Sequence, residues 1–227
     1  MKAMILAAGR GERLQPLTRE LPKALVPAGG KPLIAWHLER LAASGCREAV
    51  VNLSHLGERI AHALGDGERW GLRIAYSREA EPLETAGGIA QALPLLGEEP
   101  FLLVNADIWC DYDFSRLRTV DLGTRLSHLV LAPNPPHHPR GDFTLQAGLV
   151  GNGTAPRYTY TGIAVMLPAL VAGVPRGSKA PLAPLLRAAA ENGRLSGELH
   201  EGTWHDVGTR ERLAALEKML ASRHENR

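Results

Sequence analysis

Cysteine and aromatic residues are scarce in this chain. It has 2 cysteines among 227 residues, and phenylalanine, tryptophan and tyrosine together make up 5%. Cys46 and Cys110 lie far apart and form no C-x-x-C pair, so the sequence favours neither a disulfide framework nor a zinc site and fits a reducing cytoplasm. Long apolar runs are absent as well, because the apolar start at residues 3–8 leads directly into Arg10 and Glu12. We therefore expect no membrane span, no signal peptide and no membrane partner.

A clustered excess of positive charge is also missing. The chain has 26 lysines and arginines against 24 aspartates and glutamates, a formal net charge of +2, and these residues are scattered along the sequence. Nonspecific binding to nucleic acid requires a basic face, so nucleic acid is not an expected partner. With 44% hydrophobic residues, the chain can form one well-buried domain or a domain with two lobes. Nothing in the sequence points to an obligate protein partner.

A glycine-rich loop follows the apolar residues 4–8. The Rossmann fingerprint G-x-G-x-x-G fails because Leu14 stands at its third glycine, and the P-loop sequence G-K-[ST] is missing. Gly9 and Gly11 nevertheless let the backbone turn so that its N–H groups, with the start of a following helix, point at an anion. Arg13 and Lys23 add full positive charges. This combination predicts a site that binds a triphosphate.

Short apolar segments alternate with amphipathic ones through the first half of the chain. The expected strands are residues 3–8, 49–53, 72–76 and 101–105, and the expected helices are 32–44, 58–64 and 86–96. This alternation favours an α/β fold with a doubly wound, mostly parallel sheet. The later elements we expect are strands at 126–132 and 158–166, a proline-rich loop at 133–141 that forms a wall or lid, and a terminal helix carrying Leu213, Leu216 and Leu220.

Two early segments, 6–18 (LAAGRGERLQPLT) and 22–32 (PKALVPAGGKP), together resemble the signature of the sugar-phosphate nucleotidyltransferases. The resemblance extends over nearly the whole chain. It implies a Rossmann-like nucleotidyltransferase fold with a small sugar-binding lobe, formed by a single domain over residues 1–227. Residues 1 to about 132 would form the nucleotide-binding half, and the rest would form the sugar-binding half with the C-terminal helix. The implied reaction is attack by an oxygen of a sugar 1-phosphate on the α-phosphorus of a nucleoside triphosphate, which releases pyrophosphate.

Such a reaction requires neutralisation of phosphate charge more than it requires acid–base catalysis. The second pKa of a phosphate monoester is about 6, so the attacking group is already an anion near neutral pH and needs no general base. The sequence accordingly has no G-x-S-x-G element and no convincing Ser, His and Asp set. Cations and backbone donors must instead offset the charge of two phosphates and align them. The resemblance assigns this catalytic role to Arg13, at the departing end of the triphosphate, and to Lys23, at the α-phosphate and the attacking phosphate.

Two aspartates are expected to hold Mg²⁺. Asp107 follows the apolar segment 101–105, and open α/β sheets bind ligands beyond the carboxyl ends of their strands. Asp206 lies in W-H-D-V-G-T, which resembles a late element of the family. By resemblance, the two carboxylates would coordinate the ion together with phosphate oxygens. The alternative for each is an ordinary turn or helix-entry aspartate.

The resemblance also implies which residues contact the substrates. The segment 81–88 (EPLETAGG) would face the nucleobase. The expected nucleotide-binding residues are Leu6, Ala7, Ala8, Gly9, Gly11, Arg13, Lys23, Glu81, Ala86 and Gly87. The expected sugar-binding residues are Asn105, Gly141, Asn152 and Thr161. The family's E-K-P segment is missing, with V-G-N-G at 150–153 roughly in its place, so the sugar side departs most from the family pattern.

Three further segments, 78–93, 156–165 and 202–216, narrow the expected activity. By resemblance they imply uridylyl transfer from UTP to N-acetylmuramic acid α-1-phosphate, a step of peptidoglycan recycling. The lactyl carboxylate of that sugar requires a basic partner, for which the sequence offers Arg140, Arg157 and Lys179. Guanylyl transfer to mannose 1-phosphate, transfer to another sugar 1-phosphate, and a non-catalytic nucleotide-sugar sensor stay open as alternatives.

Overall fold

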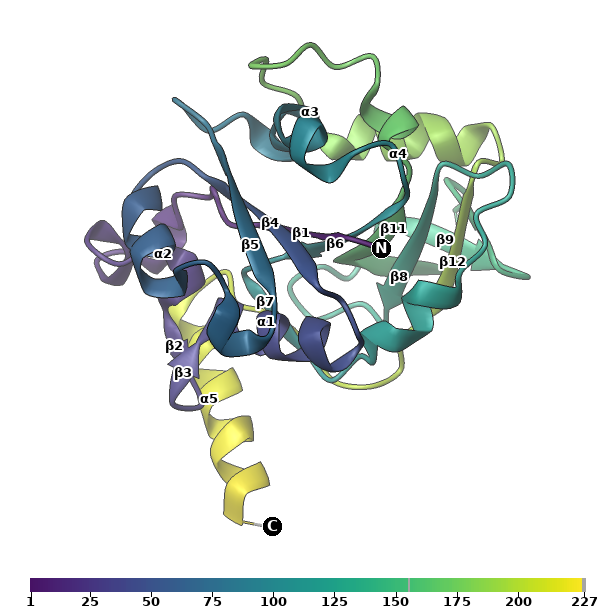
Figure 1. The fold of residues 1–227 in the computed structure, drawn as a ribbon. Coiled ribbons are helices and arrows are strands. Elements are labelled where there is room, and N and C mark those ends of the chain that lie inside the picture. The colour runs from purple at the N-terminus through teal and green to yellow at the C-terminus, as the bar shows by residue number, and fades with distance from the viewer. Residues whose placement is uncertain (155, 226–227) are drawn as a thin grey trace.

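A nine-stranded sheet forms the centre of the protein in the computed structural model, which describes residues 1–154 and 156–225 (Figure 1). The strand order is β5-β4-β1-β6-β11-β8-β12-β10-β9. The first four run parallel and are β5 (Arg73–Arg78), β4 (Glu48–Leu53), β1 (Ala3–Leu6) and β6 (Phe101–Asn105). The helices that connect them are α1 (Leu33–Ala43), α2 (Gly57–Leu64) and α3 (Glu84–Leu96). These elements confirm the alternation expected from the first half of the sequence.

The second half of the sheet is largely antiparallel. Its strands are β11 (Arg157–Met166), β8 (Ser127–Ala132), β12 (Leu195–Leu199), β10 (Leu149–Gly151) and β9 (Phe143–Gln146). Only β8 and β12 pair in parallel here, whereas β11 is antiparallel to β6, β8 and β9, and β10 is antiparallel to β12 and β9. The expectation of a mostly parallel, doubly wound sheet is therefore wrong for the chain as a whole. A tight turn such as the one between β9 and β10 reverses the strand direction, whereas the helical crossovers of the first half preserve it.

Smaller elements complete the fold. Two short strand pairs flank the main sheet: β7 (Ile108–Cys110) with β13 (Trp204–Asp206), and β2 (Pro27–Ala28) with β3 (Lys31–Pro32). The remaining α-helices are α4 (Leu182–Glu191) and α5 (Arg210–Glu225). Short 3₁₀ turns lie at Glu12–Leu14, Leu17–Arg19, Lys23–Leu25, Glu68–Trp70, Phe114–Thr119 and Pro168–Val171.

Helices cover both faces of the sheet (Figure 1). On one face, Ile34 and Leu38 of α1 and Ile60 of α2 pack with the strand residues Ile5 and Val104. On the other face, α3 and α4 pack over side chains that alternate with those, because successive residues of a strand point to opposite faces. This two-sided burial leaves the carboxyl ends of β1, β4 and β6 as the open edge where polar residues gather.

The expected terminal helix is confirmed as α5, which extends away from the body of the protein in Figure 1. The helix is fixed through Leu216 and Leu220, which pack against Val26 and Trp109. This contact holds the segment before α5, including β13, against β7. Within the described residues, no helix combines the length and the apolarity needed to cross a bilayer.

Candidate active site

Three adjoining cavities lie along the carboxyl ends of the parallel strands. The central cavity, of about 200 Å³, is lined by Leu6, Ala7, Ala8, Gly9, Lys23, Ala24, Asn52, Glu79, Pro82, Glu84, Thr85, Asn105, Ala106 and Asp107. The loop cavity, of about 690 Å³, is lined by Gly9, Arg10, Gly11, Glu12, Arg13, Lys23, Pro82, Glu84, Asp107, Lys179 and Gly208. The α4 cavity, of about 460 Å³, is lined by Glu84, Thr85, Asn105, Asp142, Phe143, Tyr160, Pro181, Leu182, Ala183, Leu186 and Arg187. Because the three share lining residues, they form one cleft.

The glycine-rich loop forms one wall of the loop cavity, and its shape depends on Gly11. This residue has φ +65°, and a Cβ there would lie 3.0 Å from Thr18 Cγ2 and 3.1 Å from Lys23 Cβ. The Thr18 hydroxyl donates a hydrogen bond to the Gly11 carbonyl at 2.7 Å. The expected helix after the loop is only the 3₁₀ turn Glu12–Leu14, so the helix dipole adds little here. The positive charge of this cavity comes instead from its side chains.

Lys23 and Asp107 form an ion pair where the central and loop cavities meet. Lys23 Nζ lies 2.5 Å from Asp107 Oδ2, and the lysine side chain is only 10% exposed. Arg13, by contrast, is exposed at the outer part of the loop cavity. The structure therefore places one expected cation deep in the cleft and the other near its mouth.

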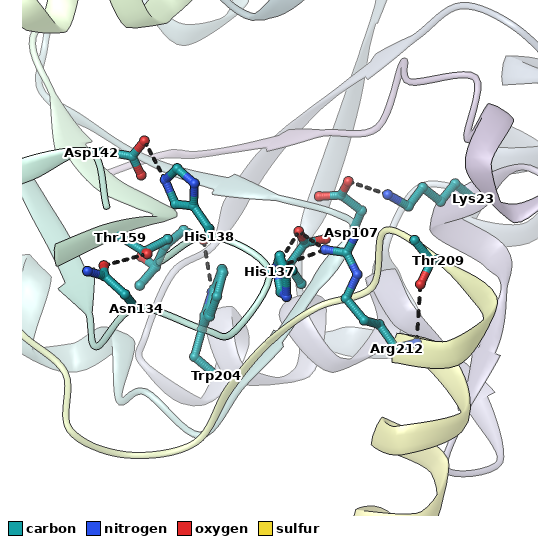
Figure 2. A network of polar contacts seen from close by, with 12 residues as sticks. Lys23, Asp107, Asn134, His137, His138, Asp142, Thr159, Trp204, Thr209 and Arg212 are labelled. Atoms are coloured by element: carbon teal, nitrogen blue, oxygen red, sulfur yellow. Dashed lines mark hydrogen bonds and ion pairs between the residues drawn. The ribbon is translucent and has the colours of Figure 1, made fainter. Parts of the chain in front are cut away.

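The backbones at the two expected metal ligands are joined across a pair of short strands, although Asp107 lines the cleft and Asp206 lines none of its three cavities. In the pairing of β7 with β13, Asp206 stands opposite Ile108, and the Val207 N–H donates to the Asp107 carbonyl at 2.9 Å. Arg212 of α5 donates to the Asp206 carboxylate, and His137 Nε2 lies 3.6 Å from the same carboxylate oxygen. Figure 2 shows Lys23 pointing at Asp107, and Arg212 and His137 meeting nearby.

These carboxylates suit a magnesium ion. Magnesium prefers oxygen ligands and is commonly held by one or two carboxylates plus substrate phosphates. Within residues 1–154 and 156–225, no group of three or more His, Cys, Asp or Glu side chains is arranged to hold a metal without such help. The carboxylate oxygens of Asp107 and Asp206 are of the chemical type that Mg²⁺ prefers.

A buried histidine supports β7, the strand that follows Asp107 and pairs with the strand of Asp206. His37 Nε2 lies 2.8 Å from the Ile108 carbonyl, and burial lowers the pKa of His37 from 6.5 to about 4. A neutral ring can donate from Nε2 to a carbonyl, so α1 fixes the position of β7. Sequence reasoning missed this role because the contact joins residues 71 positions apart.

A buried polar network forms the back wall of the central cavity. The Asn52 side chain accepts from the Ala7 N–H at 2.7 Å and donates to Glu79 at 2.7 Å. The other oxygen of Glu79 accepts from the Leu83 N–H at 2.9 Å, and burial raises the pKa of this carboxyl. A Cβ on Gly88 would lie 2.7 Å from Glu79 Oε1 and 2.8 Å from Asn52 Nδ2, so a larger residue would have to displace this network. Sequence reasoning missed both Asn52 and Glu79.

The expected base-facing residues lie beside this wall and are already engaged. The N–H groups of Ala86 and Gly87 both donate to the Ala180 carbonyl, at 2.9 and 3.1 Å. Glu81 is exposed and lies 3.4 Å from Lys179. None of the three lines any of the three cavities described above, whereas their neighbours Glu84 and Thr85 do.

Glu84 has an unusual backbone conformation. Its φ is +60°, a left-handed value that side chains other than glycine rarely adopt. Glu84 is also the one residue that lines all three described cavities. Strained residues of this kind cluster at functional sites when the surrounding structure holds them in place.

The expected sugar-binding residues are divided by the structure. Asn105 lines both the central and the α4 cavity, and Gly141, with φ +58°, precedes the lining residue Asp142. The Thr161 hydroxyl is buried and donates to the Val130 carbonyl at 2.7 Å. The Asn152 side chain donates to the Arg187 carbonyl at 2.8 Å. Thr161 and Asn152 therefore make internal contacts and line neither cavity.

The proline-rich loop at 133–141 lies against the same end of the cleft. Its His137 reaches Asp206 and Arg212, and His138 Nε2 lies 3.0 Å from Asp142 Oδ1 (Figure 2). Asn134 accepts from the Thr159 hydroxyl at 2.9 Å. The loop is thus held at several points and connects the Asp206 side of the site to the sugar side.

The sequence of residues 2–122 matches a family described as nucleotidyl transferase. Over 98% of its length, the chain is 50% identical to the N-acetylmuramate alpha-1-phosphate uridylyltransferase of Neisseria meningitidis, covering 99% of that protein. The chain belongs to the nucleotidyl transferase family. A second relative with the same name, from Caulobacter vibrioides, is 38% identical over 96% of both chains.

Other matches to this nucleotidyl transferase extend less far or are more distant. A mannose-1-phosphate guanyltransferase of Aspergillus fumigatus is 32% identical over 92% of this chain but 61% of its own length. A solved structure of a putative glucose-1-phosphate thymidylyltransferase from Bacillus anthracis superposes with a TM-score of 0.86. It covers 97% of this chain and 95% of its own, at 18% identity. That likeness shows a mixed α/β nucleotidyl transferase fold.

Proposed function

We propose that this protein transfers the uridylyl group of UTP to N-acetylmuramic acid α-1-phosphate, giving the UDP-sugar and pyrophosphate. The observation that carries the choice of substrates is the 50% identity, over nearly the full length of both chains, to a uridylyltransferase of that name. The reaction forms a bond between the acceptor phosphate oxygen and the α-phosphorus. It breaks the bond from the α-phosphorus to the bridging oxygen, which leaves with pyrophosphate.

Lys23 and Arg13 are the catalytic cations in this proposal. Lys23 is held deep in the cleft beside Asp107, where its charge can offset the α-phosphate and the approaching acceptor phosphate. Arg13 lies toward the outside of the loop cavity, where it can offset the departing pyrophosphate. The backbone of the Gly9 to Gly11 loop supplies N–H donors for the same phosphates. No general base is required, because the acceptor phosphate is largely ionised near neutral pH.

Asp107 and Asp206 are the proposed ligands of Mg²⁺. When bound, the ion would screen the phosphate charges and polarise the α-phosphate. The work of the chain is to present the two carboxylates from paired strands, with Lys23 and Arg212 offsetting their charge. The proposed nucleotide contacts are the loop residues of the central and loop cavities, with Glu81, Ala86 and Gly87 kept as neighbours of the base. Asn105, Gly141, Asn152 and Thr161 remain the proposed sugar-side residues.

The proposal divides one domain between two tasks. Residues 1 to about 132 contribute most of the central and loop cavities, and residues 133–227 contribute most of the α4 cavity. A cytoplasmic location belongs to the same proposal, and it is supported by Cys46 and Cys110, which are both free and buried.

The test is a product assay with a panel of substrates. Purified protein with Mg²⁺ is given each of four nucleoside triphosphates with each of several sugar 1-phosphates, and pyrophosphate and the nucleotide sugar are measured. UTP with N-acetylmuramic acid α-1-phosphate should give the highest kcat/KM. No pyrophosphate from this pair would contradict the proposal. Highest turnover of GTP with mannose 1-phosphate would support the alternative that the Aspergillus relative favours. Tight product binding without any turnover would support a sensor.

A further inference from the structure

The α4 cavity is lined by a basic residue, Arg187, whose side chain has no partner among the described residues. Its wall combines apolar side chains such as Phe143 and Leu186 with two acids, Glu84 and Asp142, and one guanidinium, that of Arg187. In the part of the chain that the structure describes, the Arg187 guanidinium makes no hydrogen bond or ion pair. The arginine is exposed, so its side chain can reach a ligand in the cavity.

The three basic residues that the sequence offered for an acceptor carboxylate lie elsewhere. Arg157 donates to the Asp142 main-chain carbonyl and does not line the α4 cavity. Lys179 lies 3.4 Å from Glu81 and lines the loop cavity, on the phosphate side. Arg140 is exposed and lines none of the three cavities. Their positions therefore make Arg187 a better candidate than any of these three for the partner of the acceptor carboxylate.

The backbone beneath Arg187 is firmly held. Leu182 and Leu186 of the same helix are buried in the core, and the Asn152 side chain donates to the Arg187 carbonyl at 2.8 Å. The segment that leads into α4 is tied to α3, because the Ala180 carbonyl accepts from two N–H groups there. A binding group on a rigid helix can be positioned more reproducibly than one on a loop.

We propose that Arg187 binds the carboxylate of the acceptor and makes the enzyme select a carboxylate-bearing sugar 1-phosphate. The inference rests on the proposed uridylyltransferase function. Glu84 and Asp142 in the same cavity would repel an anionic acceptor if no cation offset them. An arginine can grip a carboxylate with two parallel hydrogen bonds, and a volume of about 460 Å³ suits a small ligand.

The test compares two acceptors that differ only in the lactyl group: N-acetylmuramic acid 1-phosphate and N-acetylglucosamine 1-phosphate. For Arg187→Met, kcat/KM with the first acceptor should fall about 10- to 100-fold, mainly through KM, while the second should change less than about twofold. Arg187→Lys keeps the positive charge but lacks the planar guanidinium that can donate two parallel hydrogen bonds. Its kcat/KM with N-acetylmuramic acid 1-phosphate should lie between the values for wild type and Arg187→Met. Dissociation constants of the two UDP-sugars, measured by calorimetry, should show the same selective loss without requiring turnover.

The matched control is Arg140→Met, which removes an exposed arginine outside the cleft and should leave both acceptors unchanged. Thermal unfolding should match wild type for both variants, because both side chains are exposed. Equal losses of Arg187→Met with both acceptors, or a selective loss in Arg140→Met instead, would overturn the inference. If wild type turns over N-acetylmuramic acid 1-phosphate and Arg187→Met does so equally well, the inference fails while the function stands. If wild type rejects that acceptor, both fall.

Discussion

The phosphate end and the α4 end of the cleft differ in how their charges are satisfied. At the phosphate end, both acids are paired, Asp107 with Lys23 and Asp206 with Arg212, and only the exposed Arg13 at the mouth lacks a partner among these charged residues. At the α4 end, the Arg187 guanidinium and the buried Tyr160 hydroxyl have no partner within the described residues. Arranged charges at the first end suit chemistry that every nucleoside triphosphate shares. Polar groups that await a ligand at the second end suit the recognition of one particular sugar.

Removal of the Lys23 side chain should cause the largest loss of activity and should test the phosphate end alone. Lys23→Met should lower kcat/KM about 10³-fold with every acceptor, because it removes a buried cation from the reacting phosphates. The matched control is Lys31→Met, which lies in the same sequence motif but pairs with Glu39 on the surface. Steady-state kinetics of pyrophosphate release check both. A loss confined to one acceptor would mean that the phosphate end also selects the sugar.

Loss of either proposed metal-ligand carboxylate should cause the second largest fall in kcat/KM. Asp107→Asn and Asp206→Asn should each lower kcat/KM about 100-fold and raise the Mg²⁺ concentration needed for half-maximal activity. Magnesium titrations of initial rates measure this. Asp121→Asn, at a surface turn where the side chain accepts from Gly123 N–H, serves as the control. If only one of the two aspartates changed the magnesium requirement, the shared site would be disproved.

His37 makes the scaffold of the phosphate end sensitive to acid. Its folded-state pKa is lowered from 6.5 to about 4, so the unfolded chain binds a proton more readily. The stability from the neutral ring is present above pH 6.5 and is lost as pH falls toward 4. From the pKa difference, the free energy of unfolding should drop by about 2 kcal/mol between pH 8 and pH 5 through this residue.

Denaturant unfolding of wild type and His37→Leu at both pH values isolates this contribution. The variant is less stable at pH 8, because the Ile108 carbonyl loses its donor, but its stability should fall less on acidification. His128 and His205, whose pKa values are also lowered by burial, contribute equally to both proteins and cancel. Identical pH dependence in the two proteins would show that His37 is not held neutral.

The smallest expected effect is on stability and comes from Glu84, which lines both ends of the cleft. Glu84→Gly relieves a left-handed backbone and should raise the free energy of unfolding by about 1 kcal/mol. Ala147→Gly, at φ +49° in the turn between β9 and β10, should gain a similar amount. Only the Glu84 variant should change KM for either substrate, since only Glu84 lines the cleft. Unchanged kinetics in Glu84→Gly would make its conformation a purely structural feature.

The sequence predicted the phosphate end better than the α4 end for a physical reason. Gly9, Gly11, Arg13 and Lys23 lie within two adjacent motifs, and Asp107 follows a buried strand whose end must reach the ligand edge. These are local patterns, and the structure brings their residues to one cleft.

The sugar side depends on contacts that no local pattern encodes. The strands β9, β10 and β12 are short and contain polar residues or glycine, so their alternation is weak, and α4 contains a proline. Arg187 reaches the cleft only because α4 packs over the sheet beside α3. Asn52 of β4 likewise meets Glu79, the residue that follows the neighbouring strand β5. The N–H groups of Ala86 and Gly87 donate to the carbonyl of Ala180, nearly 100 residues later. The glycine at position 88 was the best sequence signal of this buried pair, because a Cβ there would collide with Glu79 and Asn52.

Electron paramagnetic resonance of Mn²⁺, used in place of Mg²⁺, tests most directly whether Asp107 and Asp206 converge on one nucleotide-bound ion. With UTP present, wild type should bind one Mn²⁺ per chain, and Asp107→Asn and Asp206→Asn should each weaken that binding at least about tenfold. Manganese binding that is indifferent to UTP, or that survives the loss of either aspartate unchanged, would contradict the account.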